Sequence, residues 1–139
     1  MPLKLTLKPN EKLIVNGAVV SNGSPRAVTL TFHNKAQLLQ QKDVLLPEDA
    51  STPLLRTYFA LQCMYLDHDD METHHKQFVA FCDELYTATR NAVIRTAVTT
   101  AVDYVKSGEF YRALSALRAA LPVEKQLLAG DDPSGTRPT

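Results

Sequence analysis

The sequence predicts an α+β fold, in which a small antiparallel β module precedes a helical bundle. Short segments of alternating apolar and polar residues fill the first third of the chain, and two Asn-Gly pairs separate them. Apolar residues at helical spacing dominate after residue 53. We therefore expect a β module at residues 1–46, a helical region at 47–129 and a disordered tail at 130–139.

The β module is expected to be a meander of short strands joined by tight turns. Asn16-Gly17 suits the two positive-φ positions of a type I′ hairpin turn, and residues 22–25 (NGSP) are typical of a second turn. Residues 36–46 are ambiguous between a strand and a short helix, and we favour a strand because the segment follows the meander. The predicted strands are residues 3–7, 12–15, 18–20, 27–32 and 36–46.

The helical region carries clear start and stop signals. Residues 49–53 (DASTP) offer Ser/Thr caps and place Pro53 at a first helical position. The acidic residues that begin at Asp67 suit the start of the next helix, and Ser107-Gly108 predicts a helix stop. Pro122 is expected to interrupt the last amphipathic helix, with a short helix after it.

Charge is distributed unevenly although the formal net charge is zero. Residues 1–46 carry six Lys/Arg and two Asp/Glu, whereas residues 47–84 carry two and eight. Two cysteines without a C-x-x-C spacing favour buried thiols in a reducing compartment. No signal peptide or membrane span is predicted, so we expect a cytoplasmic protein with no membrane partner.

Catalytic signals are weak. Asp70 and His74 are four residues apart, with Asp67, His68 and His75 nearby. A metal site is one interpretation, but sequential ligands favour a solvated acidic helix start. No nucleophile-elbow, phosphate-loop or zinc-protease motif occurs. We therefore predict a non-enzyme without a cofactor, a metal or catalytic residues.

The basic face of the β module is the remaining candidate site. Lysine and arginine bind phosphates, and polar groups read the edges of unpaired bases. A solvated outer face is the alternative interpretation, which composition alone favours, and Phe32 is the sole aromatic residue in 1–46. The candidate RNA-binding residues are Lys8, Lys12, Arg26, His33, Asn34, Lys35 and Lys42.

Three stretches resemble the FlbT family of flagellum biosynthesis proteins. They are LKLTLKPNEKLIVNGAVV near the start, NKAQLLQQKDVLLPEDASTPLLRTYFALQCMYLD in the middle and YRALSALRAALPVEKQLL near the end. The resemblance implies a post-transcriptional repressor that acts on flagellin messenger RNA through its 5′ untranslated leader and promotes its decay or blocks its translation. It also implies a FlaF-like flagellar protein or flagellin as a further partner, while the sign of regulation stays open.

A second resemblance covers only the first third of the chain. LTLKPNEKLIVNGAVV followed by RAVTLTF is similar to the opening strands of the CsrA-like RNA-binding proteins, which are intertwined β dimers. The residue before Lys8 is basic in that family and is Leu7 here. This departure argues against the base-reading contacts of that family but leaves Lys8 and Lys12 as expected phosphate contacts.

Two functional hypotheses follow. In the first, the β module binds the leader, with five cations at phosphates and His33 and Asn34 near a base, while the helices brace the sheet or mediate homo-oligomerisation. In the second, the protein is an adaptor or chaperone whose helices bind a flagellar protein and whose effect on RNA is indirect.

Overall fold

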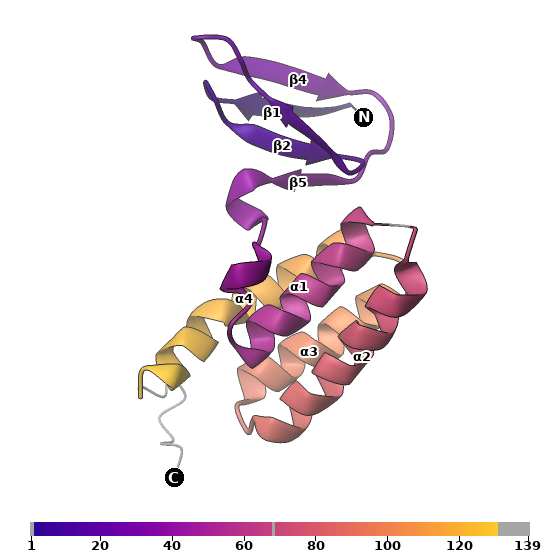
Figure 1. Cartoon of the computed structure of the whole chain (residues 1–139), viewed down its shortest axis with the longest axis vertical. Coiled ribbons are helices and arrows are strands. Elements are labelled where there is room, and N and C mark those ends of the chain that lie inside the picture. The colour runs from indigo at the N-terminus through magenta and orange to yellow at the C-terminus, as the bar shows by residue number, and fades with distance from the viewer. Residues whose placement is uncertain (1, 68, 131–139) are drawn as a thin grey trace. The chain divides into compact units, whose positions relative to one another are not determined.

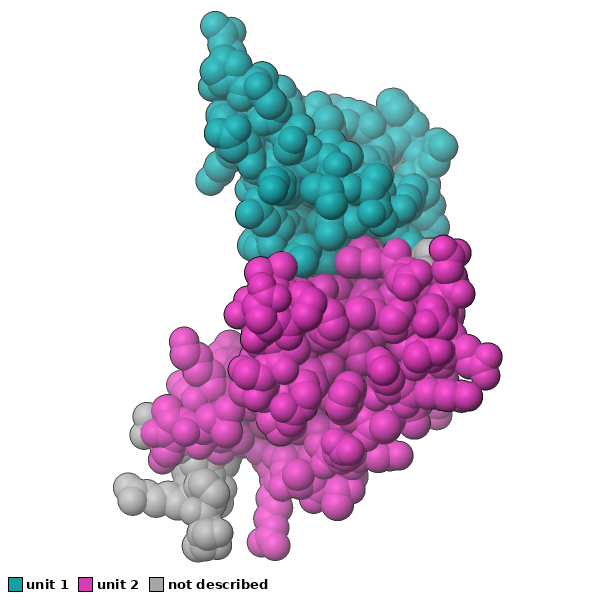
Figure 2. All heavy atoms as spheres, viewed as in Figure 1, with its two compact units in different colours: residues 1–44 teal, residues 45–139 magenta. Residues whose placement is uncertain are grey.

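The computed structural model describes residues 2–67 and 69–130, and the chain divides into two compact units, residues 1–44 and 45–139 (Figures 1 and 2). We call them the β unit and the helical unit. The strands are β1 (Leu3–Leu7), β2 (Lys12–Val15), β3 (Ala18–Ser21), β4 (Val28–Phe32) and β5 (Leu38–Gln40). The helices are α1 (Pro53–Leu66), α2 (Met71–Ala88), α3 (Ala92–Lys106) and α4 (Phe110–Leu128). The predicted α+β class is confirmed.

The β unit consists of two small antiparallel sheets. β1 pairs with β4, from Leu3 opposite Phe32 to Leu7 opposite Val28. β2 lies between β3 and β5 in the second sheet. The predicted meander was therefore wrong in its strand order, because β1 pairs with the strand that follows the β2–β3 hairpin. Alternation along a segment identifies a strand, but it carries no information about a partner distant in sequence.

The two Asn-Gly pairs have different roles. Asn16 and Gly17 adopt φ values of 50° and 85°, as predicted for the tight turn between β2 and β3. Asn22 is instead buried, and its side-chain amide donates to the carbonyl oxygens of Leu7 and Arg26 at 3.0 and 2.8 Å. This side chain ties the end of β1 to the segment that enters β4.

Residues 36–46 form a shorter strand than predicted. β5 ends at Gln40, and a 3-10 helix follows at Gln41–Asp43. The side chain of Gln41 ends the ladder, because its Oε1 accepts the backbone N–H of Lys12 at 3.2 Å, where the Gln41 carbonyl would otherwise accept. A second 3-10 helix, Pro47–Asp49, leads to α1. Residues 131–139, most of the predicted tail, lie outside the described residues.

The helical unit has a continuous apolar core. α1 packs against α2 and α4, and α3 packs mainly against α4. Every helix contributes to this core, and five of its side chains are at most 2% exposed: Leu54 and Leu61 of α1, Phe78 of α2, Ile94 of α3 and Leu117 of α4. The apolar spacing in the sequence therefore marks the faces that pack together.

The first helix begins at the predicted cap. The Thr52 hydroxyl accepts the backbone N–H of Leu55 at 3.2 Å, and Pro53 occupies the first helical position. The same hydroxyl donates to the carboxylate of Glu124, whose Oε2 accepts the backbone N–H of Leu54 at 2.8 Å. The buried Glu124 therefore links the last part of α4 to the start of α1.

The later helix ends agree with one prediction and contradict another. Gly108 has a φ of 75° just after α3, so the predicted stop is confirmed. α4 runs through Pro122 to Leu128, so the predicted interruption was wrong. Proline removes one intrahelical hydrogen bond, but Ala120 before it and Glu124 after it are both buried, and this packing holds the helix together.

Candidate nucleic-acid interface

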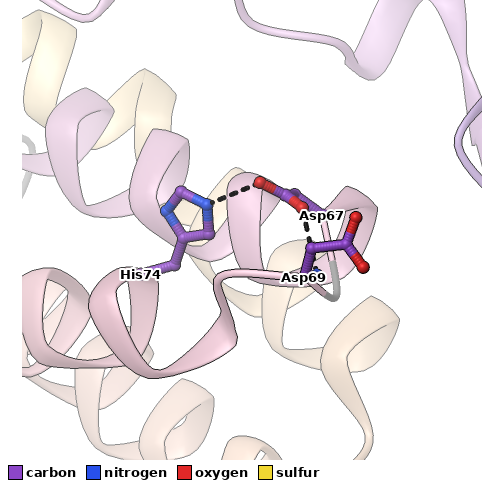
Figure 3. Close-up of polar contacts among 3 residues, drawn as sticks. All are labelled: Asp67, Asp69 and His74. Carbon is purple, nitrogen blue, oxygen red and sulfur yellow. Dashed lines mark hydrogen bonds and ion pairs between the residues drawn. The ribbon is translucent and has the colours of Figure 1, made fainter.

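The His and Asp residues that follow α1 form a polar link between two helices (Figure 3). Asp67 caps the end of α1, and its Oδ2 lies 3.1 Å from Nε2 of His74 in the first turn of α2. Oδ1 of Asp67 accepts the backbone N–H of Asp69 at 3.1 Å. Asp70, which shares a helical face with His74, bonds it through backbone atoms at 3.2 Å. His68 lies outside the described residues.

This link has no arrangement suited to a metal ion within residues 2–67 and 69–130. In those ranges, no three His, Cys, Asp or Glu side chains converge as potential ligands. His75 is exposed, while the side chain of His74 is 17% exposed and contacts the carboxylate of Asp67. The contact joins the end of α1 to the first turn of α2.

Both cysteines are free and shielded from ionisation. Cys82 is 5% exposed, and its burial, together with the charge of Asp83, raises the pKa of its thiol to about 12. Burial and then the charge of Asp67 raise the pKa of Cys63. Nucleophilic and metal-binding cysteines act as thiolates, so these pKa shifts suit packing rather than chemistry.

All seven predicted RNA-binding residues are exposed, but the structure divides them between opposite ends of the β unit. β1 carries the chain from Leu3, opposite Phe32, to Leu7, opposite Val28, and the second sheet runs between the same ends. One end holds Lys8, Lys12, Arg26 and Lys42, and we call it the basic end. The other end comprises residues 15–16 and 31–36, including His33, Asn34 and Lys35, and we call it the pocket end.

Hydrogen bonds hold the segments of the basic end together. The backbone N–H of Asn10 donates to the carbonyl of Asn22 at 2.8 Å, and the Asn22 side chain reaches the carbonyl of Arg26. The backbone N–H of Lys12 donates to the Gln41 side chain. Four cations are therefore carried on neighbouring turns that are far apart in the sequence.

Two acidic residues reduce the charge of this end without cancelling it. Glu11 and Asp43 lie in the same segments as the four cations, which leaves a formal charge of +2. The Glu11 carboxylate accepts the backbone N–H of Lys8 at 3.1 Å, so it stabilises the turn after β1. The residue before Lys8 contributes nothing to the surface, since Leu7 is 2% exposed.

The pocket end is an open depression of about 310 Å³. Val15 and Asn16 come from the end of β2 and its turn, Thr31 and Phe32 come from β4, and the next four residues complete the lining. His33, Asn34 and Lys35 thus lie together, as their sequence adjacency predicts, but away from the other four candidates.

Five lining residues of the pocket were not predicted from the sequence, namely Val15, Asn16, Thr31, Phe32 and Ala36. Phe32, the sole aromatic residue of the β module, is half-buried and also forms part of the pocket. The Asn16-Gly17 turn was a visible signal, because it marks one end of the second sheet. The pairing of β5 with β2, which brings this turn to residues 33–37, has no local signal.

No helix in the described part of the chain is both long and apolar enough to cross a membrane. Among the described residues, the candidate interface offers cations for phosphates at one end and a polar pocket with an aromatic wall at the other.

Comparisons with known proteins give a consistent family. Residues 3–128 match the family model described as flagellar protein FlbT. A probable flagellum biosynthesis repressor protein FlbT from Caulobacter sp. (strain K31) is 40% identical, over 92% of this chain and 97% of the relative. The flagellum biosynthesis repressor protein FlbT of Caulobacter vibrioides (strain CB 15) is 38% identical, over 92% and 90%.

A further relative is less similar in sequence. A probable flagellum biosynthesis repressor protein FlbT from Rhodopseudomonas palustris (strain TIE-1) is 33% identical, over 93% of this chain and 99% of the relative. No solved structure matches this chain significantly. The family model and these relatives both extend from the β unit through α4. The chain therefore belongs to the FlbT family of flagellar proteins.

Proposed function

We propose that this protein represses flagellin expression after transcription, by binding the 5′ untranslated leader of flagellin messenger RNA through its β unit. The names of the relatives support a repressor of flagellum biosynthesis. The basic end carries the proposal, because hydrogen bonds hold turns bearing four exposed cations side by side. Bound protein would exclude the ribosome and leave the message to cellular nucleases, so the protein needs no degradative chemistry of its own.

The physical basis is counterion release. Lys8, Lys12, Arg26 and Lys42 have exposed side chains, and each phosphate that they neutralise frees condensed cations from the RNA. Such contacts fix the position of the RNA and read no sequence. The basic end therefore accounts for binding strength, and selectivity for the leader must come from other residues.

The test is a titration of the purified chain with the flagellin leader and a scrambled leader at several salt concentrations. For single strands, the slope of log affinity against log salt is about −0.7 for each phosphate neutralised, so four contacts predict a slope near −3. Leader-selective binding with that slope supports the proposal. No binding, or equal binding to both RNAs, would contradict direct recognition of the leader by the protein.

Charge reversal separates the basic end from general electrostatics. We expect the triple variant Lys8→Glu, Lys12→Glu and Lys42→Glu to lose most affinity for both RNAs and to show a slope closer to zero. The matched control reverses Arg56, Arg90 and Lys125, which are exposed cations of the helical unit. The control changes net charge equally and should keep most of the affinity, and circular dichroism checks that both variants fold.

Exposed apolar side chains on the helices favour a second candidate, the binding of a flagellar protein. Val79 and Tyr86 of α2 are 43% and 44% exposed, and Val93 of α3 is 49% exposed. A partner that covers them would make the effect on RNA indirect. Under this candidate the charge reversals leave repression intact in cells, and Val79→Ser with Tyr86→Ser abolishes it.

A further inference from the structure

The pocket end has the size and openness of a site for one small planar group. Its volume of about 310 Å³ lies at the lower limit of ligand pockets, which range from about 300 to 1,000 Å³. Strand β4 supplies an aromatic wall in Phe32, and Val15 and Ala36 supply further apolar surface. A flat ring with apolar faces fits this lining better than a flexible or wholly polar molecule does.

The walls are held in place before any ligand arrives. The backbone N–H of Asn16 donates to the carbonyl of Gln37 at 2.8 Å, and the Asn16 side-chain oxygen accepts the backbone N–H of Gln37 at the same distance. These two bonds fasten the connection after β4 to the turn after β2, across 21 positions of sequence. Binding therefore needs little further ordering of the backbone.

The polar side chains of the pocket are available to a ligand. Within the described part of the chain, the side chains of His33, Asn34 and Lys35 take part in no hydrogen bond or ion pair. All three are exposed, and no acidic residue lines the pocket. The lining therefore suits a group that is flat, carries hydrogen-bonding edges and is attached to a negative charge.

We infer that the pocket end binds a single unpaired adenine of the RNA, with Lys35 at its phosphate. The inference rests on the RNA binding proposed above, and it assigns the reading of a base to this end. Asparagine offers a donor and an acceptor on one amide, which match the amino group and ring nitrogen of adenine. Phe32 and His33 provide rings against which an unpaired base stacks.

Nuclear magnetic resonance on the full chain tests the pocket directly, with adenosine and cytidine 5′-monophosphates as probes. We expect saturable amide shifts confined to residues 15–16 and 31–36, with adenosine monophosphate binding roughly tenfold more tightly. Asn34→Leu should remove that preference, and Lys35→Ala should weaken both nucleotides. Lys4→Ala is the control, because Lys4 is an exposed cation of the same unit outside the pocket.

The same variants in the leader titration separate this inference from the proposed function. We expect Asn34→Leu to reduce the discrimination between leader and scramble roughly tenfold with an unchanged salt slope. Unchanged discrimination, or nucleotide shifts only at the basic end, would overturn the pocket and leave the proposed function standing. If the unaltered chain binds no RNA at all, both fail.

Discussion

The two units differ in what they do with their apolar and charged side chains. Among the described residues, the helical unit contains seventeen buried apolar side chains, while the β unit contains three, namely Leu7, Leu13 and Leu39. The β unit instead exposes its cations and the polar rim of a pocket. Stability therefore resides mainly in the helices, whereas the surface that we assign to RNA lies on a thin scaffold.

The largest loss of stability is expected from truncation of a core leucine in the helical unit. Leu117→Ala in α4 removes a side chain with 0% exposure and should reduce the free energy of unfolding by about 2–5 kcal/mol. Leu30→Ala in β4 removes a half-buried side chain and should cost clearly less. Urea unfolding measures both, and equal losses would contradict the proposed division of stability.

The second-largest loss of stability is expected from removal of the buried carboxylate of Glu124. Glu124→Ala leaves the backbone N–H of Leu54 and the hydroxyl of Thr52 without their partner, at a cost of about 2–3 kcal/mol. Thermal unfolding measures the loss, and Glu109→Ala is the control, because the carboxylate of Glu109 is exposed and pairs only with Arg112 among the described residues. If Glu109→Ala lowers the stability as much as Glu124→Ala does, the hydrogen bonds of the buried carboxylate make no specific contribution to stability.

The turn of the β unit should respond more weakly. Asn16→Ala removes the bond to the Gln37 amide and places alanine at a φ of 50°, which together should cost about 1–2 kcal/mol. Asn16→Gly removes the same side chain, but glycine adopts a positive φ without strain, so the loss of unfolding free energy should be smaller. Hydrogen exchange at the Gln37 amide reports the local effect, and unchanged protection in both variants would rule out this fastening.

The smallest expected effect, a change in the pH dependence of stability, is at Cys82. Burial raises the pKa of the folded thiol from 9.0 to about 12, so the unfolded chain ionises first. This contribution to stability is complete below pH 9 and is lost as the pH rises from about 9 to 12. Cys82→Ala should flatten that part of the curve of unfolding free energy against pH, and an identical slope would refute the assignment.

Local sequence signals predicted most of the helices and strands, whereas the way in which these elements pair and pack was not predictable from local signals. Thr52 and Gly108 mark helix ends that a reader of the sequence can identify, because caps and stops act within a few residues. The strand order and the continuity of α4 through Pro122 depend on distant packing.

The same limit applies to the candidate site. The cations of the site can be read from the sequence, but their separation into two ends depends on the pairing of β1 with β4. The pocket depends on the pairing of β2 with β5. Asn16 illustrates the difference, since its turn was predictable and its bond to Gln37 was not.

The link between Glu124 and the start of α1 has a consequence for the order in which the chain folds during synthesis. Every strand of the β unit has its partner once β5 has left the ribosome, so this unit can form early. The helical unit must wait, because the group that bonds Thr52 and Leu54 is among the last helical residues to emerge. The nascent protein therefore carries the part to which we assign RNA binding before its stabilising part is complete.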